Sequence, residues 1–174
     1  MAIMKMPCAV GGGGIGDITA LVPILTADNS SAECTAITNS TAGADYYAYK
    51  SFDADGYSSW NPNNNNATDE YLGVTFTSAH DIKLIDMALA SMQQIRTFNF
   101  DIEVYDGSNW SKIDTWSLTP PLGTQSGTSF LNCPEYVKQI NAKGVYGIRI
   151  FSAESLSVYG VYYIALPRLQ FFGV

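Results

Sequence analysis

An eight-residue segment in the middle of the chain, residues 98–105, alternates strictly between apolar side chains and polar or amphipathic ones. Its apolar members are Phe98, Phe100, Ile102 and Val104. Because successive side chains of a strand point to opposite faces, this period of two predicts an antiparallel strand that is buried on one side. Residues 106–109, Asp-Gly-Ser-Asn, then predict a turn, and residues 110–118 are expected to return as the hairpin partner.

Similar short segments recur along the rest of the chain. Residues 71–77 again place apolar side chains at every second position. Further strands are expected at residues 82–89, 145–151, 158–164 and 168–172. A turn or two of helix is expected at residues 134–142, where Pro134 stands near a helix start and Val137 and Ile140 share one side. Many short strands, few helices and turn-rich connections predict an all-β fold, a β-sandwich or jelly roll.

Composition supports this fold class and limits the partners. The chain has 174 residues, the length of one domain, and 13% of them are aromatic, a class that favours strands. Its 16 acidic and 9 basic residues give a net charge of −7, which argues against nucleic acid or an anionic membrane as the main partner. No apolar run is long enough for a transmembrane helix, so no membrane insertion is expected.

Residues 1–20 differ from the rest of the chain. They begin with small and apolar residues and continue into a glycine tract at residues 11–16, a composition typical of flexible tethers. We therefore expect an N-terminal arm and Gly-rich tether at 1–20 and a folded domain at 21–174. The first residues lack the apolar core of a signal peptide, which predicts synthesis in a cytoplasm.

The three cysteines are odd in number and lack the spacing of a zinc site; they are Cys8, Cys34 and Cys133. Free buried thiols are expected, with one disulfide plus one free thiol as the alternative.

The sequence offers no catalytic arrangement. The glycine tract lacks the Lys-Ser/Thr ending of a phosphate-binding loop, and no Gly-x-Ser-x-Gly motif accompanies His80, the single histidine. His80 is expected in a loop between two strands. Carboxylate pairs such as Asp53 with Asp55 have no surrounding pattern that would support glycoside hydrolysis. We therefore expect a protein that is not an enzyme.

Four segments, in order along the chain, resemble the discoidin family. Residues 49–60, Tyr-Lys-Ser-Phe-Asp-Ala-Asp-Gly-Tyr-Ser-Ser-Trp, are similar to its signature without a gap. Residues 71–76 resemble a family strand, residues 100–110 resemble its Asp-Gly hairpin, and residues 146–151 with 168–173 resemble its closing strands. The family is also called F5/8 type C or galactose-binding-like, and it includes many carbohydrate-binding modules. The resemblance covers about residues 25–174.

The resemblance implies a jelly-roll β-sandwich without a catalytic apparatus, whose ligands, commonly cell-surface sugars, bind at loops clustered at one end. Trp60 is expected in the core, where the family uses that position to close the sandwich. Loop tyrosines and arginines suit sugars, which offer a C–H face for stacking and hydroxyls for hydrogen bonding. The candidate ligand-binding residues are Tyr46, Tyr47, Arg96, Tyr159 and Tyr162. For each tyrosine, ordinary packing is the alternative, and for Arg96 it is an ion pair with an acidic residue.

The resemblance also implies a structural Ca²⁺ site. Asp53, Asp55 and Ser58 occupy three of the family's ligand positions, but Arg168 stands where the family usually has glutamate. Two neutralising partners for these carboxylates are therefore open. One is Ca²⁺, and the other, which we favour, is the Arg168 guanidinium itself.

A discoidin-like domain behind a Gly-rich arm resembles the layout of small phage tail and head-fibre proteins. We therefore expect a virion structural protein that displays a carbohydrate-binding domain for host attachment, with the arm docking on other virion proteins; homo-oligomerisation is left open. Two alternatives remain. One is a free-standing carbohydrate-binding module or adhesin of a bacterial cell surface. The other is a purely structural virion decoration protein without a glycan ligand.

Overall fold

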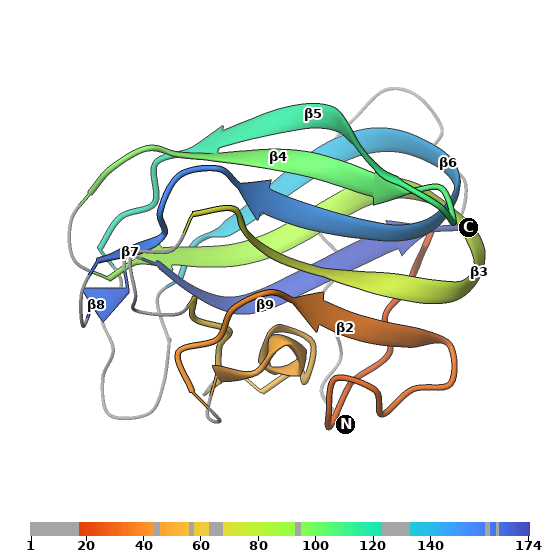
Figure 1. Cartoon of the computed structure of the whole chain (residues 1–174), viewed down its shortest axis with the longest axis horizontal. Coiled ribbons are helices and arrows are strands. Elements are labelled where there is room, and N and C mark those ends of the chain that lie inside the picture. The colour runs from red at the N-terminus through yellow and green to blue at the C-terminus, as the bar shows by residue number, and fades with distance from the viewer. Residues whose placement is uncertain are drawn as a thin grey trace.

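The computed structural model describes residues 18–43, 46–55, 58–62, 68–92, 95–122, 133–158, 161–162 and 164–174. This part of the chain consists of strands, loops and a short 3₁₀ helix (Figure 1). The elements are β1 (Thr19–Ala20), β2 (Cys34–Thr38), η2 (Ala48–Ser51), β3 (Glu70–Ser91), β4 (Phe98–Tyr105), β5 (Trp110–Leu118), β6 (Glu135–Ser152), β7 (Ser157–Val158), β8 (Val161–Tyr162) and β9 (Ile164–Gly173).

Two long strands build both layers of the fold. β3 has 22 residues and β6 has 18, and their register shifts between Thr75 and Leu84. The first part of β3 pairs with β2 and with the end of β6, which also pairs with β4. The second part of β3 pairs with β9 and with the start of β6. In Figure 1 both ribbons curve at the right-hand end, so that one hydrogen-bonded path, β1-β9-β3-β6-β4-β5, folds over on itself.

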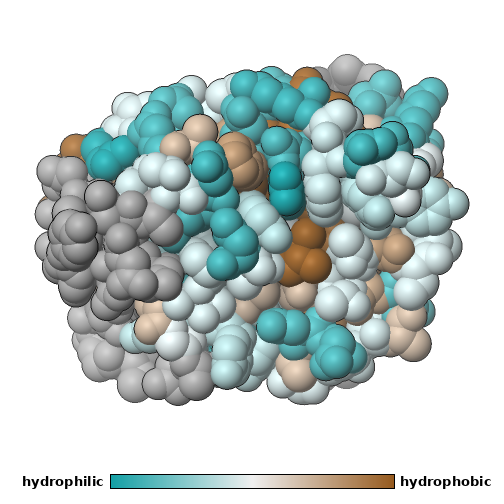
Figure 2. Space-filling view, viewed as in Figure 1, coloured by the Kyte–Doolittle hydropathy of each residue, from teal (hydrophilic) through white to brown (hydrophobic). Residues whose placement is uncertain are grey.

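The result is an all-β antiparallel jelly-roll sandwich, as the sequence predicts. The alternation of β4 is confirmed, because Phe98, Phe100, Ile102 and Val104 are buried and the residues between them are not. Trp60 is confirmed in the core at 1% exposure, and its indole N–H donates a hydrogen bond of 2.9 Å to the Ser40 carbonyl. The face seen in Figure 2 is covered largely by hydrophilic and intermediate side chains.

The helix expected at residues 134–142 is wrong, because residues 135–142 are the first part of β6. Its side chains follow a period of two: Tyr136 and Ile140 pack against the core, whereas Val137 points outward with 44% exposure. The adjacent strand β3 provides hydrogen-bonding partners along this segment, such as Ile85 opposite Lys138. Pairing with a neighbouring strand thus overrides the local helical signal.

Two further expectations about strands need correction. Residues 71–77 and 82–89 are parts of one strand, β3, rather than of two. His80 consequently lies within β3 and not in a loop, next to the register shift, with its ring centroid 4.8 Å from that of Phe76.

The folded domain begins before residue 21. Thr19 and Ala20, which were expected to belong to the arm, form β1 and pair with Gly173 and Phe172 of β9. The Gln170 side chain extends this attachment, since its amide donates to the Val22 carbonyl (2.9 Å) and its carbonyl accepts from the Val22 N–H (3.3 Å). Residues 1–17 lie outside the described residues.

Two of the three cysteines are described, and both are free thiols. Cys34 is buried, as expected, and Cys133 is half-buried, where burial raises the pKa of its thiol to about 11. Cys8 lies outside the described residues. No helix in the described part of the chain has the length and apolar character needed to span a bilayer.

Candidate functional site

The strand register brings several loops to one end of the sandwich. Glu70, the first residue of β3, pairs with Ser152, the last residue of β6, and Phe98 at the start of β4 pairs with Leu118 at the end of β5. The segments that follow or precede these residues therefore lie at a common end, at the left of Figure 1, which we call the loop end. The chain end at Gly173 and its partner Thr19 lie at the opposite end.

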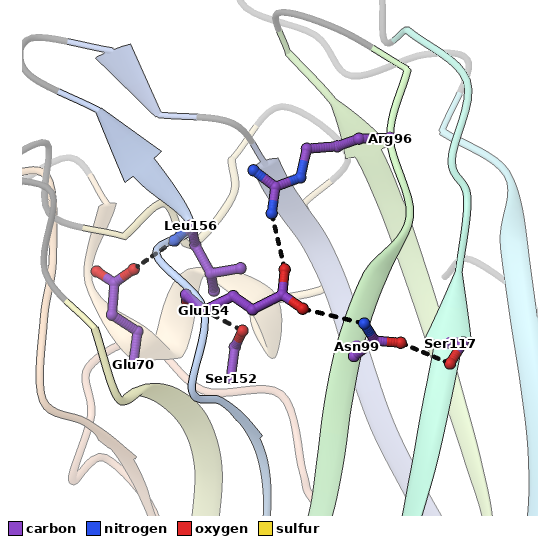
Figure 3. Close-up of polar contacts among 7 residues, drawn as sticks. All are labelled: Glu70, Arg96, Asn99, Ser117, Ser152, Glu154 and Leu156. Carbon is purple, nitrogen blue, oxygen red and sulfur yellow. Dashed lines mark hydrogen bonds and ion pairs between the residues drawn. The ribbon is translucent and has the colours of Figure 1, made fainter.

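Four polar side chains form a connected group at the loop end, which we call the loop-end cluster: Arg96, Asn99, Ser117 and Glu154 (Figure 3). The Arg96 guanidinium lies 2.8 Å from Oε2 of Glu154. The Asn99 amide donates to Oε1 of the same carboxylate (3.0 Å), and the Ser117 hydroxyl donates to the Asn99 carbonyl (2.7 Å). The cluster thus joins the segments before β4 and after β6 to strands β4 and β5.

The cluster is partly exposed to solvent and packs on an aromatic ring. Arg96 and Glu154 are 27% and 44% exposed, and the guanidinium lies over the Phe98 ring, 4.8 Å from its centroid. A cation at this distance is attracted to the face of the ring. The cluster therefore presents N–H donors and carboxylate acceptors close together, which is the chemistry that sugar hydroxyls require.

The sequence indicates Arg96 but not its partners, and the pair with Glu154 is the ion pair expected as the alternative to ligand binding. Asn99 is one of the polar residues of the alternating segment 98–105, and no local pattern marks Ser117 or Glu154. The register of β4, β5 and β6 is what brings these residues together.

A buried carboxyl group lies beneath this end of the molecule. Glu70 has 0% exposure, and it accepts a hydrogen bond from the Ser40 hydroxyl (2.7 Å) and another from the Leu156 N–H (3.1 Å). Burial raises the pKa of Glu70, while the two hydrogen bonds oppose that shift. No sequence motif indicated this residue.

Of the four candidate tyrosines, the structure describes the side chains of Tyr46 and Tyr47. Tyr47 is 44% exposed, just before η2, and its ring centroid lies 6.3 Å from that of Tyr49. Tyr46 is half-buried and its N–H donates to the Gly43 carbonyl (3.0 Å). Tyr162 belongs to β8, but its side chain is outside the described residues, as is all of Tyr159.

The signature loop brings Asp53 and Ser58 together. The Asp53 carboxylate accepts from the Asp55 N–H (2.9 Å) and from the Ser58 hydroxyl. The Ser58 oxygen also lies 3.4 Å from the Lys50 carbonyl and 3.5 Å from the Asp55 carbonyl. The single hydroxyl proton of Ser58 can fully satisfy only one of these acceptors. The oxygen atoms of Asp53, Lys50 and Asp55 thus meet around the Ser58 oxygen. Oxygen atoms of this kind are the ligands that Ca²⁺ prefers. In the described part of the chain, no group of three or more His, Cys, Asp or Glu residues is placed to hold a metal.

The expectation that Arg168 neutralises Asp53 or Asp55 is wrong. Its guanidinium lies 3.0 Å from the Asp86 carboxylate on β3 and 3.0 Å from the Glu135 carboxylate on β6. Arg168 thus pairs with carboxylates of the neighbouring strands β3 and β6 and not with those of the signature loop.

No family model matches the chain, and no curated protein matches it significantly. Several solved structures are similar. The family 32 carbohydrate-binding module of NanJ from C. perfringens, solved with galactose, has a TM-score of 0.62 and 14% identity, and the match covers 90% of this chain and 99% of that one. CpGH89CBM32-5 from Clostridium perfringens, solved with GalNAc-β-1,3-galactose, has a TM-score of 0.60 and 13% identity over 89% of this chain and 100% of that one. Chitosan-binding module 1 of the chitosanase/glucanase from Paenibacillus sp. IK-5 has a TM-score of 0.57 and 17% identity over 89% and 99%. At these identities the comparison shows the fold: the chain has the jelly-roll β-sandwich of the discoidin-like carbohydrate-binding modules.

Proposed function

We propose that this domain is a non-catalytic carbohydrate-binding module that binds a cell-surface glycan at the loop end. The observation that carries the proposal is the exposed loop-end cluster, in which the Arg96 guanidinium and the Asn99 amide share the Glu154 carboxylate. Paired donors and acceptors of this kind suit the neighbouring hydroxyls of a sugar. The similar solved structures that contain galactose or GalNAc-β-1,3-galactose support the ligand class.

The absence of catalysis is part of this proposal. His80 is at the opposite end of the sandwich from the cluster, 3.4 Å from the Ser78 hydroxyl and packed on Phe76. A general base there cannot reach a sugar bound at the loop end. His80 therefore cannot act on that sugar, and the likeness to carbohydrate-binding modules supports binding without turnover of any glycan.

Binding can be measured by calorimetry with galactose, GalNAc-β-1,3-galactose and chitotriose, and more broadly on a glycan array. Arg96→Met removes the guanidinium of the cluster and should weaken binding about tenfold or more. Lys112→Met is the matched control, because Lys112 forms another exposed ion pair, 2.8 Å from Asp101 on the same layer. Absence of binding to every glycan tested, or equal losses in both variants, would overturn the proposal.

A structural Ca²⁺ in the signature loop is a separate proposal. Asp53 and Ser58, with the carbonyls of Lys50 and Asp55, are the residues that would hold it. The ion would neutralise the Asp53 carboxylate and fix the loop before Trp60. With Arg168 committed to Asp86 and Glu135, Ca²⁺ is the remaining one of the two neutralising partners.

The setting of the domain is a further proposal. A Gly-rich segment ahead of a binding domain suits display on a larger assembly, and we propose a virion protein that mediates host attachment. The alternatives are a bacterial surface module or adhesin and a virion decoration protein without a glycan ligand. Mass spectrometry of purified particles would separate the two virion hypotheses from the bacterial one, and the glycan array would separate the binding proteins from the decoration protein.

A further inference from the structure

A buried carboxyl group connects two loops to the loop-end cluster, although it is not itself exposed. Glu70 receives its two hydrogen bonds from residues that are 30 and 86 positions away, Ser40 after β2 and Leu156 after β6. We propose that Glu70 is a positioning residue of the glycan site, which holds the segment after β6 so that Glu154 meets Arg96 and Asn99. This inference rests on the proposed function and deepens it.

Glu70 holds the segment around Glu154 from both sides. Its backbone pairs with Ser152 in the β3–β6 register, and its side chain binds the N–H of Leu156. Glu154 lies midway between these two points, and the Ser152 hydroxyl donates to its carbonyl (3.1 Å). Figure 3 shows Glu70 and Arg96 on opposite sides of this segment. The position of the Glu154 carboxylate thus depends on the contact between Glu70 and Leu156.

The other oxygen of Glu70 ties this segment to the core. Ser40 donates its hydroxyl to Glu70, and its carbonyl accepts the indole N–H of Trp60 at 2.9 Å. Trp60 is 1% exposed and is bridged to Leu166 of β9. A chain of contacts therefore runs from the core tryptophan through Ser40 and Glu70 to the segment that carries Glu154.

Stability alone does not account for a carboxyl group at this place. Among the described residues, Glu70 is fully buried and has no ion-pair partner, a situation that is unfavourable for a carboxylate. An apolar side chain would avoid that cost but would leave the buried Leu156 N–H without an acceptor. A group with two oxygens at the end of a long side chain can serve both loops at once.

The test compares Glu70→Ala, Glu70→Asp and Glu70→Gln in the full chain. Glutamine can accept from Leu156 through its carbonyl and donate to the Ser40 oxygen through its amide, so it should preserve the site. Alanine removes both contacts. Aspartate keeps the charge but is one methylene shorter, so it cannot hold both loops, and it serves as the milder variant if the alanine protein does not fold.

Two quantities are measured well below the unfolding temperature. These are the hydrogen-exchange rate of residues 152–156 and the affinity for galactose, GalNAc-β-1,3-galactose and chitotriose. In Glu70→Ala and Glu70→Asp, exchange should rise about tenfold or more and affinity should fall about fivefold or more, whereas Glu70→Gln should keep the wild-type values. Asp86→Asn is the matched control, because it weakens another buried carboxylate contact of β3, that with Arg168, on the second part of the strand, where β3 pairs with β9.

Unchanged exchange and affinity in both Glu70→Ala and Glu70→Asp, or equal effects in Asp86→Asn, would overturn the inference. If the wild-type protein binds none of the sugars, the proposed function fails. The exchange rates then still decide whether Glu70 holds the segment that carries Glu154.

Discussion

One guanidinium nitrogen of Arg168 on β9 lies 3.0 and 3.1 Å from the two carboxylate oxygens of Asp86 on the neighbouring strand β3. The Asp86 side chain is 11% exposed, and Glu135 of β6 approaches the same nitrogen at 3.0 Å from the other side. Burial raises the pKa of Asp86, and the charge of Arg168 opposes that shift. Arg168 therefore links β9 to both β3 and β6 through charge, whereas its backbone pairs with β3 alone.

Arg168→Met should lower the free energy of unfolding by about 1–3 kcal/mol, because Asp86 stays buried and loses its counter-charge. Arg168→Glu should destabilise the protein further, since it places a third carboxylate beside Asp86 and Glu135. Urea denaturation measures both. Arg96→Met is the control: its ion pair is exposed, so its loss should change the free energy of unfolding by only about 0–1 kcal/mol. Equal destabilisation by Arg168→Met and Arg96→Met would contradict this account.

Removing calcium should destabilise the protein through the signature loop. If Ca²⁺ is held by Asp53, Ser58 and neighbouring carbonyls, a chelator should lower the melting temperature by several degrees, and added Ca²⁺ should restore it. Asp53→Asn should abolish the response. Asp106→Asn, in the exposed turn between β4 and β5, should respond to the chelator as the wild type does. If the chelator does not change the melting temperature, the Asp53 carboxylate is stabilised by its hydrogen bonds from the Ser58 hydroxyl and the Asp55 N–H alone.

Stability should depend on pH through Glu70. Burial raises the pKa of Glu70 in the folded state above its ordinary value of 4.5, so the folded protein holds this proton more tightly than the unfolded chain does. The stabilisation is fully present below pH 4.5 and is lost as the pH rises through the folded-state pKa. Glu70→Gln cannot lose this proton. It should melt like the wild type near about pH 4 and at a higher temperature than the wild type near about pH 8.

Melting curves of both proteins at the two pH values measure this effect. Glu33→Gln, on the exposed segment before β2, is the control and should follow the wild type at both. A constant difference between wild type and Glu70→Gln across the pH range would contradict the assignment.

Truncation of the N-terminus should show which of the first 22 residues contribute to the stability of the sandwich. Deleting residues 1–17 should leave the melting temperature nearly unchanged, while impairing incorporation into any particle that carries the protein. Deleting residues 1–22 should lower the melting temperature. This deletion removes β1, the hydrogen bond from the Leu21 N–H to the Phe171 carbonyl, and the side chain of Val22, which is 2% exposed. Burial of one such side chain is worth about 1.5–3 kcal/mol. Equal melting of the two truncated proteins would show that β1 and Val22 contribute little.

The parts of the fold that the sequence predicts are those where local pattern and tertiary pairing agree. In β4 and β5 the alternation, the turn residues and the register all favour one hairpin, and the bounds of both strands are as expected. In the first part of β6, Pro134 and the spacing of Val137 and Ile140 favour a helix locally, and only the adjacent β3 makes a strand the better solution. No local signal carries that information.

The candidate site divides in the same way. Arg96 and the pair of Asp53 and Ser58 could be found from the sequence, because a loop position and a family signature mark them. Glu70 and Glu154 could not, since each acquires its role from residues at least 30 positions away: Ser40 and Leu156 for Glu70, and Asn99 and Arg96 for Glu154. The family motif gives the position of Arg168 in β9 but not its neighbours across β3 and β6, and it therefore predicts the wrong carboxylate partner.

The short pairing of β1 with β9 has a mechanical consequence. Thr19 lies beside Gly173 at the end opposite the loops, and β1 runs antiparallel to β9. When a ligand holds the loops and the preceding chain is pulled away, tension enters the domain at Thr19 and acts along the axis of β1. The backbone bonds between the two strands lie across that direction, so they and the Gln170–Val22 contacts resist in shear and share the force, rather than opening one after another. A domain tethered in this way can stay folded while it is pulled between its ligand and its anchor.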